Sequence, residues 1–489
     1  VAILGSGPSG LAACKAALEE GLQPTVFEQA AGVGGLWRGD GSGKVWTSLH
    51  TNLSKYTCAF SDTPWPQATP DFPSGSEVQS YLESYAARHG LLQHLRPCSR
   101  VVSVELLAEK GGWQVTWEEV GVEAQRRRLS ETFTFVVVAT GIFSQPHRSA
   151  LPGLDAFSGE VLHAADYRDP RQLAGRRVLV VGAAFSGADI AADMAGTATS
   201  VTVAARRPLW YLPRYIGGRP TDLAFYSRAA SDRGKGASEE ERNLQRHTFF
   251  ASLVGDLPSP LLTPEPSCGD LPFVAITDHF LDAVRSRRVT VRATDVVAFE
   301  GRSVVFADGG QEEFDAVVLA TGYRLKLPFL PPWALEAIEH HPDDLLQPAI
   351  LHECVWRPEL PGLAFVGLYR GPYFGVIELQ ARWACGVFSG RLAAPGAAEL
   401  AAGIEAERSV RRQRPRPQFP HGDYVGMAEG LAHRVGVHPA ELLADEKQAL
   451  RPLLYEGPLL PCHYRLVGFR AQRAVAEATI RECAARYPV

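Results

Sequence analysis

Residues 1–28 read VAILGSGPSGLAACKAALEEGLQPTVFE, and the rest of the chain is organised around this stretch. An apolar run leads into the turn Gly5-Ser6-Gly7-Pro8-Ser9-Gly10, and an Ala- and Leu-rich segment with helical spacing follows it. The stretch closes on Thr25-Val26-Phe27-Glu28. This order predicts a strand, a glycine turn, a helix and a second strand, which together favour dinucleotide binding.

The three glycines of the turn have separate predicted roles. Gly5 makes the tight turn, Gly7 lets the backbone approach a pyrophosphate, and Gly10 lets the helix pack on the strand. The phosphates would then meet the free N–H groups at the helix N-terminus. Glu28 lies 23 residues after Gly5, where an acid can accept a hydrogen bond from a ribose hydroxyl. The alternative is a glycine turn that serves only close packing.

The length and composition indicate a multidomain globular protein. With 489 residues the chain exceeds the size at which one core stays efficient, and 46% hydrophobic and 21% charged residues are typical of globular domains. The net charge of −5 argues against a nucleic-acid partner. No apolar run reaches the length of about 18 residues that a membrane span needs. We therefore expect a cytoplasmic protein, and a targeting segment trimmed before Val1 is the open alternative.

The eight cysteines are dispersed and form no C-x-x-C pair. This spacing predicts free thiols in a reducing compartment, without a disulfide framework or a zinc site, and no residue is predicted to bind a metal. The missing C-x-x-C pair also argues against a disulfide reductase built on two dinucleotide domains.

The strand and glycine turn recur in the second third of the chain. The apolar run 178–181 leads into Gly182-Ala183-Ala184-Phe185-Ser186-Gly187, and a strand pattern follows at 201–205. Each unit also closes on a buried strand that ends in Ala-Thr-Gly, at 139–141 and at 320–322. This repetition predicts two successive nucleotide-binding domains of similar size.

The two units differ at the position that is expected to contact the ribose of the bound nucleotide. Where the first has Glu28, the second has Arg206 and Arg207, which lie 24 and 25 residues after Gly182. An acid suits a free 2′-hydroxyl and a pair of guanidinium groups suits a 2′-phosphate, so we assign FAD to the first site and NADPH to the second. Two arginines exposed at a strand end without a ligand are the alternative. Ala184 replaces the middle glycine, and its methyl group is expected to hold the pyrophosphate slightly farther away.

These patterns predict an α/β fold with two Rossmann-like dinucleotide-binding domains, the second inserted into the first. The FAD-binding domain comprises 1–150 and 323–489, because the first unit alone lacks a second wall for a flavin. The NADPH-binding domain comprises 151–322, with a partly helical insertion at about 209–260. The segment 289–306 is interpreted as a small β-meander.

A longer motif precedes the second glycine turn. Residues 157–167 fit F-x-G-x-x-x-H-x-x-x-Y, and 319–323 read LATGY. With the two glycine turns, these motifs make the sequence similar to the flavin-containing monooxygenase family, the N- and S-oxygenating kind of class B flavoprotein monooxygenases. The resemblance covers nearly the whole chain. Further matching motifs are Gly34-Gly35-Leu36-Trp37-Arg38, Asn52-Leu53-Ser54-Lys55, Phe60-Ser61-Asp62, Glu378-Leu379-Gln380, Gly422-Asp423-Tyr424 and His463-Tyr464-Arg465.

The resemblance implies a reaction. NADPH would reduce FAD, the reduced flavin would add O₂ at its C4a carbon, and the resulting hydroperoxide would oxygenate a soft nucleophile, an amine nitrogen or a sulfur. Asn52 is the residue expected to take part in the chemistry, since an amide can donate and accept and the family's matching asparagine lies near flavin and nicotinamide. A turn-forming asparagine is the alternative.

The predicted cofactor contacts combine both glycine turns with the family's motifs. His163 and Tyr167 are expected to shape the junction between the domains, and Gln380 either touches the flavin ring or makes a buried helix-to-loop hydrogen bond. The predicted cofactor-binding residues are Gly5, Gly7, Pro8, Ser9, Gly10, Glu28, Gly35, Leu36, Trp37, Asn52, Thr140, Tyr167, Gly182, Ala184, Ser186, Gly187, Arg206, Arg207, Thr321 and Gln380.

Two other functions stay open at this point. One is a Baeyer-Villiger or carbon-hydroxylating monooxygenase, although Tyr167 stands where Baeyer-Villiger relatives usually have tryptophan. The other is a catalytically silent flavoprotein that acts as a sensor. The expected partners are a small-molecule substrate and O₂, and the sequence leaves the oligomeric state open, a homodimer included.

Overall fold

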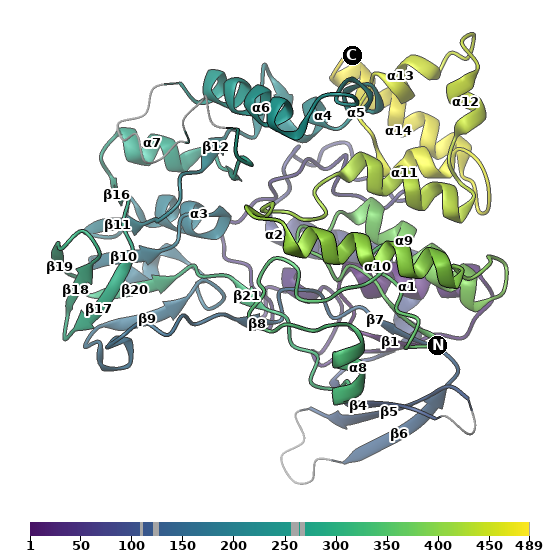
Figure 1. Cartoon of the computed structure of the whole chain (residues 1–489), viewed down its shortest axis with the longest axis horizontal. Coiled ribbons are helices and arrows are strands. Elements are labelled where there is room, and N and C mark those ends of the chain that lie inside the picture. The colour runs from purple at the N-terminus through teal and green to yellow at the C-terminus, as the bar shows by residue number, and fades with distance from the viewer. Residues whose placement is uncertain (108–110, 121–126, 256–263, 265–268, 489) are drawn as a thin grey trace.

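The computed structural model describes residues 1–107, 111–120, 127–255, 264 and 269–488, and it contains two five-stranded parallel sheets (Figure 1). The first sheet lies at the right of Figure 1 and the second at the left. Helices cover both sheets, which confirms the predicted α/β class with two Rossmann-like units.

The first sheet has the order β22-β7-β1-β2-β3, and all neighbours are parallel. Its strands are β1 (Ala2–Leu4), β2 (Thr25–Phe27), β3 (Leu95–Arg96), β7 (Val136–Val138) and β22 (Leu363–Phe365). Alternate residues of β1 face opposite cores: Ile3 packs with the helices α1 (Pro8–Glu19) and α9 (Phe374–Phe388), and Ala2 and Leu4 pack toward Trp113. The antiparallel sheet on that second side consists of β4 (Ser99–Leu106), β5 (Trp113–Glu119) and β6 (Arg128–Phe133).

The second sheet has the order β16-β11-β10-β20-β9 and is also parallel throughout. Its strands are β9 (Glu160–His163), β10 (Arg177–Val181), β11 (Ser200–Ala204), β16 (Val289–Arg292) and β20 (Ala316–Leu319). The helices α3 (Phe185–Met194) and α7 (His279–Arg285) pack on one face, where Met194 and Phe280 share a core.

The predicted meander at 289–306 is wrong in its first strand. Residues 289–292 form β16, which pairs in parallel with β11 at the edge of the second sheet. The meander consists of β17 (Val296–Glu300), β18 (Ser303–Phe306) and β19 (Gln311–Glu313), and it covers the other face of the sheet. A short run of β-branched residues can form a strand in a parallel sheet or in a meander. Pairing with β11 therefore decided that 289–292 joins the parallel sheet.

Two short strands mark where the chain passes between the sheets. β8 (Gln145–Pro146) leaves the first half, β21 (Tyr323–Arg324) returns to it, and the two pair antiparallel. β22 then joins the first sheet beside β7. The domain boundaries at 150 and 323 stay a prediction.

The segment 209–255 contains short strands and helices, and 256–260 of the predicted insertion lie outside the described residues. β12 (Trp210–Leu212) pairs in parallel with β15 (Val274–Ile276), and β13 (Tyr215–Ile216) forms a hairpin with β14 (Arg219–Pro220). The helices of this segment are α4 (Thr221–Phe225), α5 (Arg228–Arg233) and α6 (Glu239–Val254).

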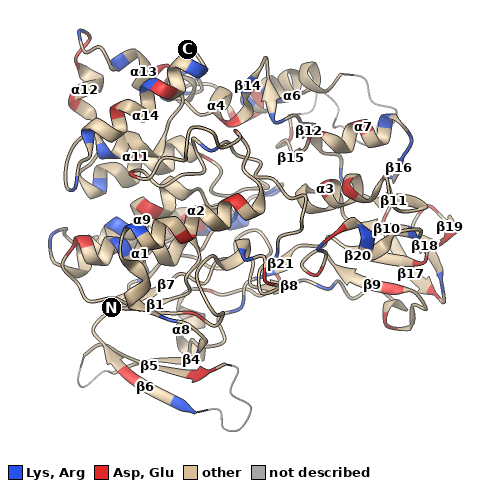
Figure 2. Cartoon of the chain, turned by 180° about the vertical axis from the view of Figure 1, so that it is seen from behind, with Lys and Arg blue, Asp and Glu red and all other residues tan. Residues whose placement is uncertain are grey.

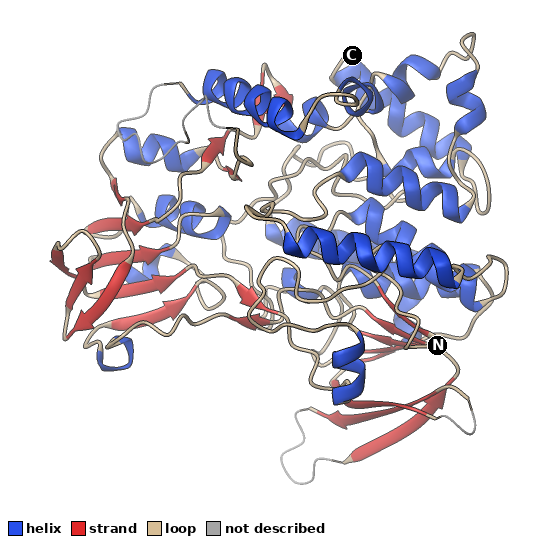
Figure 3. Ribbon diagram, viewed as in Figure 1, coloured by secondary structure: helices blue, strands red, loops and turns tan. Residues whose placement is uncertain are grey.

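Helices dominate the C-terminal part of the chain (Figure 3). The remaining helices are α2 (Gly75–Arg88), α8 (Pro332–Ala337), α10 (Ala397–Arg412), α11 (Tyr424–Val435), α12 (Ala440–Ala444), α13 (Arg451–Tyr455) and α14 (Arg473–Arg486). The short 3₁₀ helices are η1 (Gly35–Trp37), η2 (Leu91–His94), η3 (Leu154–Ala156), η4 (Pro170–Leu173) and η6 (Pro461–Arg465). Within the described ranges, every helix is too short or too polar to cross a membrane.

Candidate active site

The first glycine has the same conformation in both turns. Gly5 has φ +102° and Gly182 has φ +101°, values that L side chains rarely adopt. A Cβ at Gly5 would lie 2.7 Å from the carbonyl oxygen of Ala139, and one at Gly182 would lie 2.7 Å from that of Ala320. Both turns therefore press against the end of the neighbouring strand, β7 in the first sheet and β20 in the second.

The last glycine lets each helix pack on its turn. A Cβ at Gly10 would lie 1.8 Å from the carbonyl oxygen of Gly5, and one at Gly187 would lie 2.0 Å from that of Gly182. No other side chain fits at either position, because the contacted atom belongs to the backbone.

The middle position is the least crowded of the three in the first turn. Gly7 caps α1 with φ −72° and ψ −172°, and Ala184 caps α3 with φ −75° and ψ −168°. The methyl group of Ala184 therefore needs no change in the turn. A Cβ at Gly7 would be in ordinary van der Waals contact with the backbone of Gly35, at 3.5 Å.

These contacts give opposite predictions for two alanine variants. Gly10→Ala should lower the free energy of unfolding by about 3 kcal/mol or more, because its Cβ would overlap the Gly5 carbonyl group. Gly7→Ala should leave the unfolding temperature nearly unchanged and lower the ratio of FAD to protein, because its methyl group would narrow the space beside Gly35 where the FAD pyrophosphate is predicted to lie. Thermal unfolding and flavin absorbance of the purified variants measure both effects. Equal loss of stability in both variants would contradict the assigned roles.

Glu28 faces the glycine turn. Its carboxylate accepts hydrogen bonds from the backbone N–H and the hydroxyl of Ser6, both at 2.8 Å, and from the N–H of Ala30 at 2.8 Å. Glu28 is buried at the end of β2. The loop 32–37 closes over the same turn, since the N–H of Gly34 donates to the carbonyl oxygen of Ser6 at 3.1 Å.

Arg206 and Arg207 follow β11 and are both exposed. The guanidinium of Arg207 lies 5.6 Å from the ring centre of Phe273. Within the described part of the chain, neither arginine has an ion pair or a hydrogen bond from its side chain, so both are free to bind an anion. Along the ribbon, basic and acidic residues are interspersed over the elements (Figure 2).

The threonines at the two strand ends have different surroundings. Thr140 has a buried hydroxyl with no hydrogen-bond partner among the described groups. The hydroxyl of Thr321 donates to the carbonyl oxygen of His147. An unpartnered hydroxyl beside an open glycine turn fits a bound dinucleotide, whose oxygen atoms can pair with it.

The turn that carries Asn52 is held by two side chains of the segment 209–255. Nε of Arg214 donates to the carbonyl oxygen of Thr51 at 3.0 Å. On the other side of the turn, Asp222 accepts hydrogen bonds from the N–H of Ser54 at 3.1 Å and from its hydroxyl at 2.7 Å. The amide of Asn52 is half-buried and has no hydrogen bond to any other described residue.

Asp222 is 2% exposed, and burial raises the pKa of its carboxyl group, while hydrogen bonds from Thr57 and Ser54 oppose this shift. One oxygen, Oδ1, has no described partner. All the described side-chain hydrogen bonds of the Asp222 carboxyl group therefore come from the segment that follows Asn52.

Comparison with known proteins identifies the family. A family model described as flavin-binding monooxygenase-like matches residues 1–483. The chain belongs to this family. It is 34% identical to Flavin-containing monooxygenase 5 of Oryctolagus cuniculus, over 96% of this chain and 89% of the relative. It is 33% identical to Dimethylaniline monooxygenase [N-oxide-forming] 2 of Rattus norvegicus, over 96% of this chain and 88% of the relative.

A solved structure supports the fold of this flavin monooxygenase. S-allyl-L-cysteine S-oxygenase from Allium sativum superposes with a TM-score of 0.66 over 99% of this chain and 98% of the other, at 22% identity. The predictions of the family, of a flavin cofactor and of a monooxygenase are confirmed. The roles of individual site residues stay predictions.

The other predicted site residues have described contacts of their own. Tyr167 is fully buried beside Trp46, and its hydroxyl donates to Asp193 on α3 at 2.7 Å. Gln380 is also fully buried: its oxygen accepts from the N–H of Gly367 and its nitrogen donates to the carbonyl oxygen of Glu353, both at 3.0 Å. These bonds are the helix-to-loop alternative that the sequence left open for Gln380.

The remaining predicted residues lie in the glycine turns or η1. Pro8 and Ser9 are in the first turn of α1, and Ser186 is in the first turn of α3. In η1, Leu36 is 38% exposed, whereas Trp37 packs partly against the core. An exposed leucine beside the Gly7 turn fits a surface that a bound cofactor covers.

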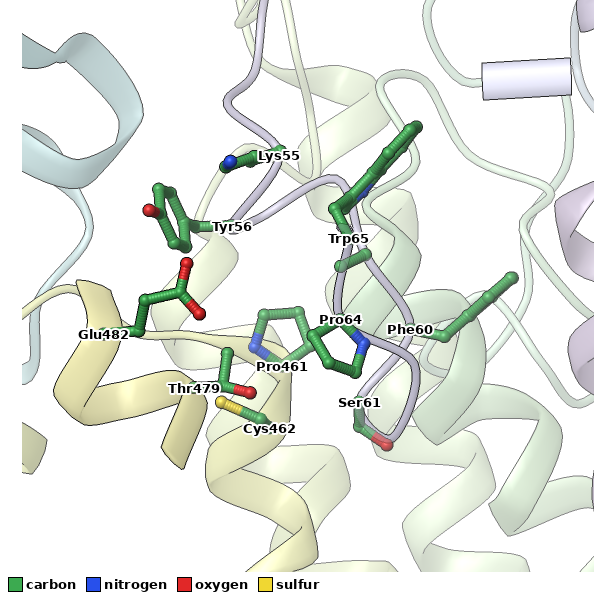
Figure 4. A pocket seen from close by; sticks show the side chains of 11 residues that line it. Lys55, Tyr56, Phe60, Ser61, Pro64, Trp65, Pro461, Cys462, Thr479 and Glu482 are labelled. Carbon is green, nitrogen blue, oxygen red and sulfur yellow. The ribbon is translucent and has the colours of Figure 1, made fainter. Parts of the chain in front are cut away.

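A pocket lies between the segment 55–65 and the C-terminal elements η6 and α14 (Figure 4). Tyr56 and Glu482 lie close together on one side of it, and Pro461 and Pro64 lie between them and Phe60 in this view. It contains none of the predicted cofactor residues. We therefore assign it no part in the reaction.

Sequence reasoning missed Arg214 and Asp222. Both lie in the segment predicted as an insertion, and they are eight residues apart. A single arginine and a single aspartate have no local pattern that points to a turn more than 150 residues away. Only the tertiary contact between the segment 209–255 and the Asn52 turn reveals them.

Proposed function

We propose that this flavin monooxygenase uses NADPH and O₂ to oxygenate a soft nucleophilic heteroatom, an amine nitrogen or a sulfur. The observation that carries the proposal is the duplicated glycine turn with Glu28 beside the first copy and two unpaired arginines beside the second. The names of the relatives support the heteroatom, since one is called N-oxide-forming and another is an S-oxygenase.

When bound, FAD supplies the activation of O₂ and NADPH supplies the reducing hydride. The chain's own residues bind and orient these groups. We propose that the turn 5–10 and the N-terminus of α1 hold the FAD pyrophosphate, with Thr140 and the loop 32–37 beside it. The turn 182–187 would hold the NADPH pyrophosphate, and Arg206 and Arg207 would pair with the 2′-phosphate.

Asn52 is the proposed catalytic residue. Its amide has no hydrogen-bond partner among the described residues, and it can both donate and accept hydrogen bonds where flavin, nicotinamide and substrate would meet. Arg214 and Asp222 fix the turn from the segment 209–255. The position of Asn52 therefore depends on contact between this segment and the Asn52 turn, and the closed site would exclude water from the reaction.

The closing experiment uses one thioether, one tertiary amine and one ketone, each with NADPH and O₂. The wild type should form the sulfoxide and the N-oxide. Asn52→Ala should retain FAD, lower the oxygenated product formed per NADPH by about tenfold, and release more hydrogen peroxide, since loss of one positioned hydrogen bond costs about 1–2 kcal/mol. Product mass, NADPH consumption and peroxide are measured together. Asn52→Asp keeps the size of the side chain and serves as the matched variant.

Two results would overturn different parts of the proposal. Ester or lactone formation from the ketone without any sulfoxide or N-oxide would replace heteroatom oxygenation by Baeyer-Villiger chemistry. If both Asn52 variants form as much oxygenated product per NADPH as the wild type, heteroatom oxygenation would stand and Asn52 would have no catalytic role.

The free thiols of this chain are typical of a protein in a reducing compartment. Six of the described cysteines are buried, Cys98 is half-buried, and all seven are free. We propose a cytoplasmic location on this basis. A homodimer stays a prediction.

A further inference from the structure

Three side chains that can bind a metal converge outside the proposed reaction site. Cys354 lies in the segment before β22, Glu407 is on α10, and His421 lies in the segment before α11. A ligand atom from each, the sulfur, a carboxylate oxygen and a ring nitrogen, lies within 4.8 Å of the other two. The three side chains line one small cavity, together with Gln347 and Tyr369.

The backbone presents Cys354 in an unusual way. Glu353 has φ +52° and Cys354 has φ +59°, so two consecutive residues other than glycine adopt the left-handed conformation. Such residues cost about 1 kcal/mol or more each and persist where surrounding contacts hold them. The carbonyl oxygen of Glu353 accepts from Gln380, and its carboxylate pairs with Arg434 at 3.1 Å. The chain thus holds the thiol of Cys354 inside the cavity, where it is 3% exposed.

The polar atoms around the cavity have capacity left for a cation. Nε2 of His421 lies 2.8 Å from Oε2 of Glu407, and Nε2 of Gln347 donates to the same oxygen at 2.6 Å. Nδ1 of His421 and Oε1 of Gln347 are buried and have no described partner, and Gln347 is only 2% exposed. The two ring nitrogens of a histidine point to opposite sides, so a cation shared by His421 and Glu407 would replace the Nε2 hydrogen bond, with the ring proton on Nδ1.

The carboxylate of Glu407 lacks a close permanent cation. Among the described residues, Glu407 has no ion pair with a lysine or arginine within 4 Å, and its ring partner His421 is charged only when protonated.

We propose that Cys354, Glu407 and His421 form a binding site for a divalent cation of the zinc type, with the side-chain oxygen Oε1 of Gln347 available as a fourth ligand. Sulfur, imidazole and carboxylate are the ligands that Zn²⁺ prefers in proteins. Zinc–ligand distances of about 2.0–2.3 Å place ligand atoms about 3–4 Å apart, so separations that now reach up to 4.8 Å would shorten and the Nε2–Oε2 separation of 2.8 Å would lengthen. The ion would join α10 and the segment before α11 to the strand β22 of the first sheet.

The test uses the purified FAD-bound protein and Zn²⁺ itself. The protein is loaded with a slight excess of Zn²⁺ and desalted, and its zinc content is then measured. We expect one equivalent per chain, with a sulfur at about 2.3 Å in the X-ray absorption spectrum of the bound zinc. Cys354→Ser should bind Zn²⁺ at least tenfold more weakly. Cys98→Ser is the matched control and should retain the full equivalent, because Cys98 lies outside the cluster.

Flavin content identifies variants that fold. If Cys354→Ser loses its FAD, Glu407→Gln replaces it as the test, since this change keeps the size of the side chain and removes its charge; it too should weaken zinc binding. A wild type that retains no zinc overturns the site. So does a bound zinc without a sulfur ligand, or equal zinc retention by the wild type and the folded site variant.

Discussion

Replacing Arg465 with methionine should lower the free energy of unfolding by about 3–5 kcal/mol. Arg465 is 1% exposed in η6, and its guanidinium lies 2.7 Å from Glu378 on α9 and 3.3 Å from Asp62. Its Nε also donates to the hydroxyl of Ser61 at 2.7 Å. Without Arg465, two buried carboxylates would lose a cation that they share, and burial would then oppose their charge.

The ion cluster around Arg465 connects segments far apart in the sequence. Lys15 on α1 pairs with Asp62 at 2.5 Å and with Glu19 at 2.9 Å. Burial raises the pKa of Glu378, but the charges of Arg465 and Lys15 outweigh it and bring this pKa to about 2. The carboxylate of Glu378 therefore stays ionised at neutral pH and needs its partners.

Arg473→Met is the matched control for Arg465→Met. Arg473 makes an exposed pair with Glu477 one helical turn away, at 2.7 Å, and such pairs contribute less than about 1 kcal/mol. Urea unfolding of the FAD-bound protein, followed by tryptophan and flavin fluorescence, compares the two variants. A similar small loss in both would show that the buried cluster adds little stability.

The double variant R206Q/R207Q should raise KM for NADPH by about 100-fold and leave KM for NADH nearly unchanged. Each guanidinium is expected to make a charge-assisted hydrogen bond to the 2′-phosphate, worth about 1.5 kcal/mol or more. NADH lacks this phosphate. Steady-state NADPH and NADH oxidation by the wild type and the variant measures the change in preference.

R287Q/R288Q is the matched control for this variant. Arg287 and Arg288 are also adjacent and exposed, but they precede β16, whereas Arg206 and Arg207 follow β11. Because β11 and β16 are parallel neighbours, the pair after β11 and the pair before β16 lie at opposite ends of the strands. The control should change neither KM. An equal rise in both KM values for R206Q/R207Q would indicate damage to the fold in place of a lost phosphate contact.

The sequence by itself determined the features that depend on neighbouring residues. The conformation of Gly5 and the close packing at Gly10 follow from steric contacts within one strand, turn and helix, so their spacing predicts them. The same pattern at Gly182 and Gly187 predicted the second unit. The contrast between Glu28 and Arg206 is likewise local to each unit, and the structure places each beside the expected strand end.

Only the tertiary structure decided which distant segments meet. It placed β16 in the parallel sheet, and it engaged Gln380 with Gly367 and Glu353. It brought Asp222 to the Asn52 turn. It also gathered Cys354, Glu407 and His421 in one cavity, whereas the spacing of the cysteines along the chain predicts no metal ligand. The physical reason is that side-chain contacts over such separations depend on how whole sheets and helices pack, and periodicity along the chain carries no measure of those distances.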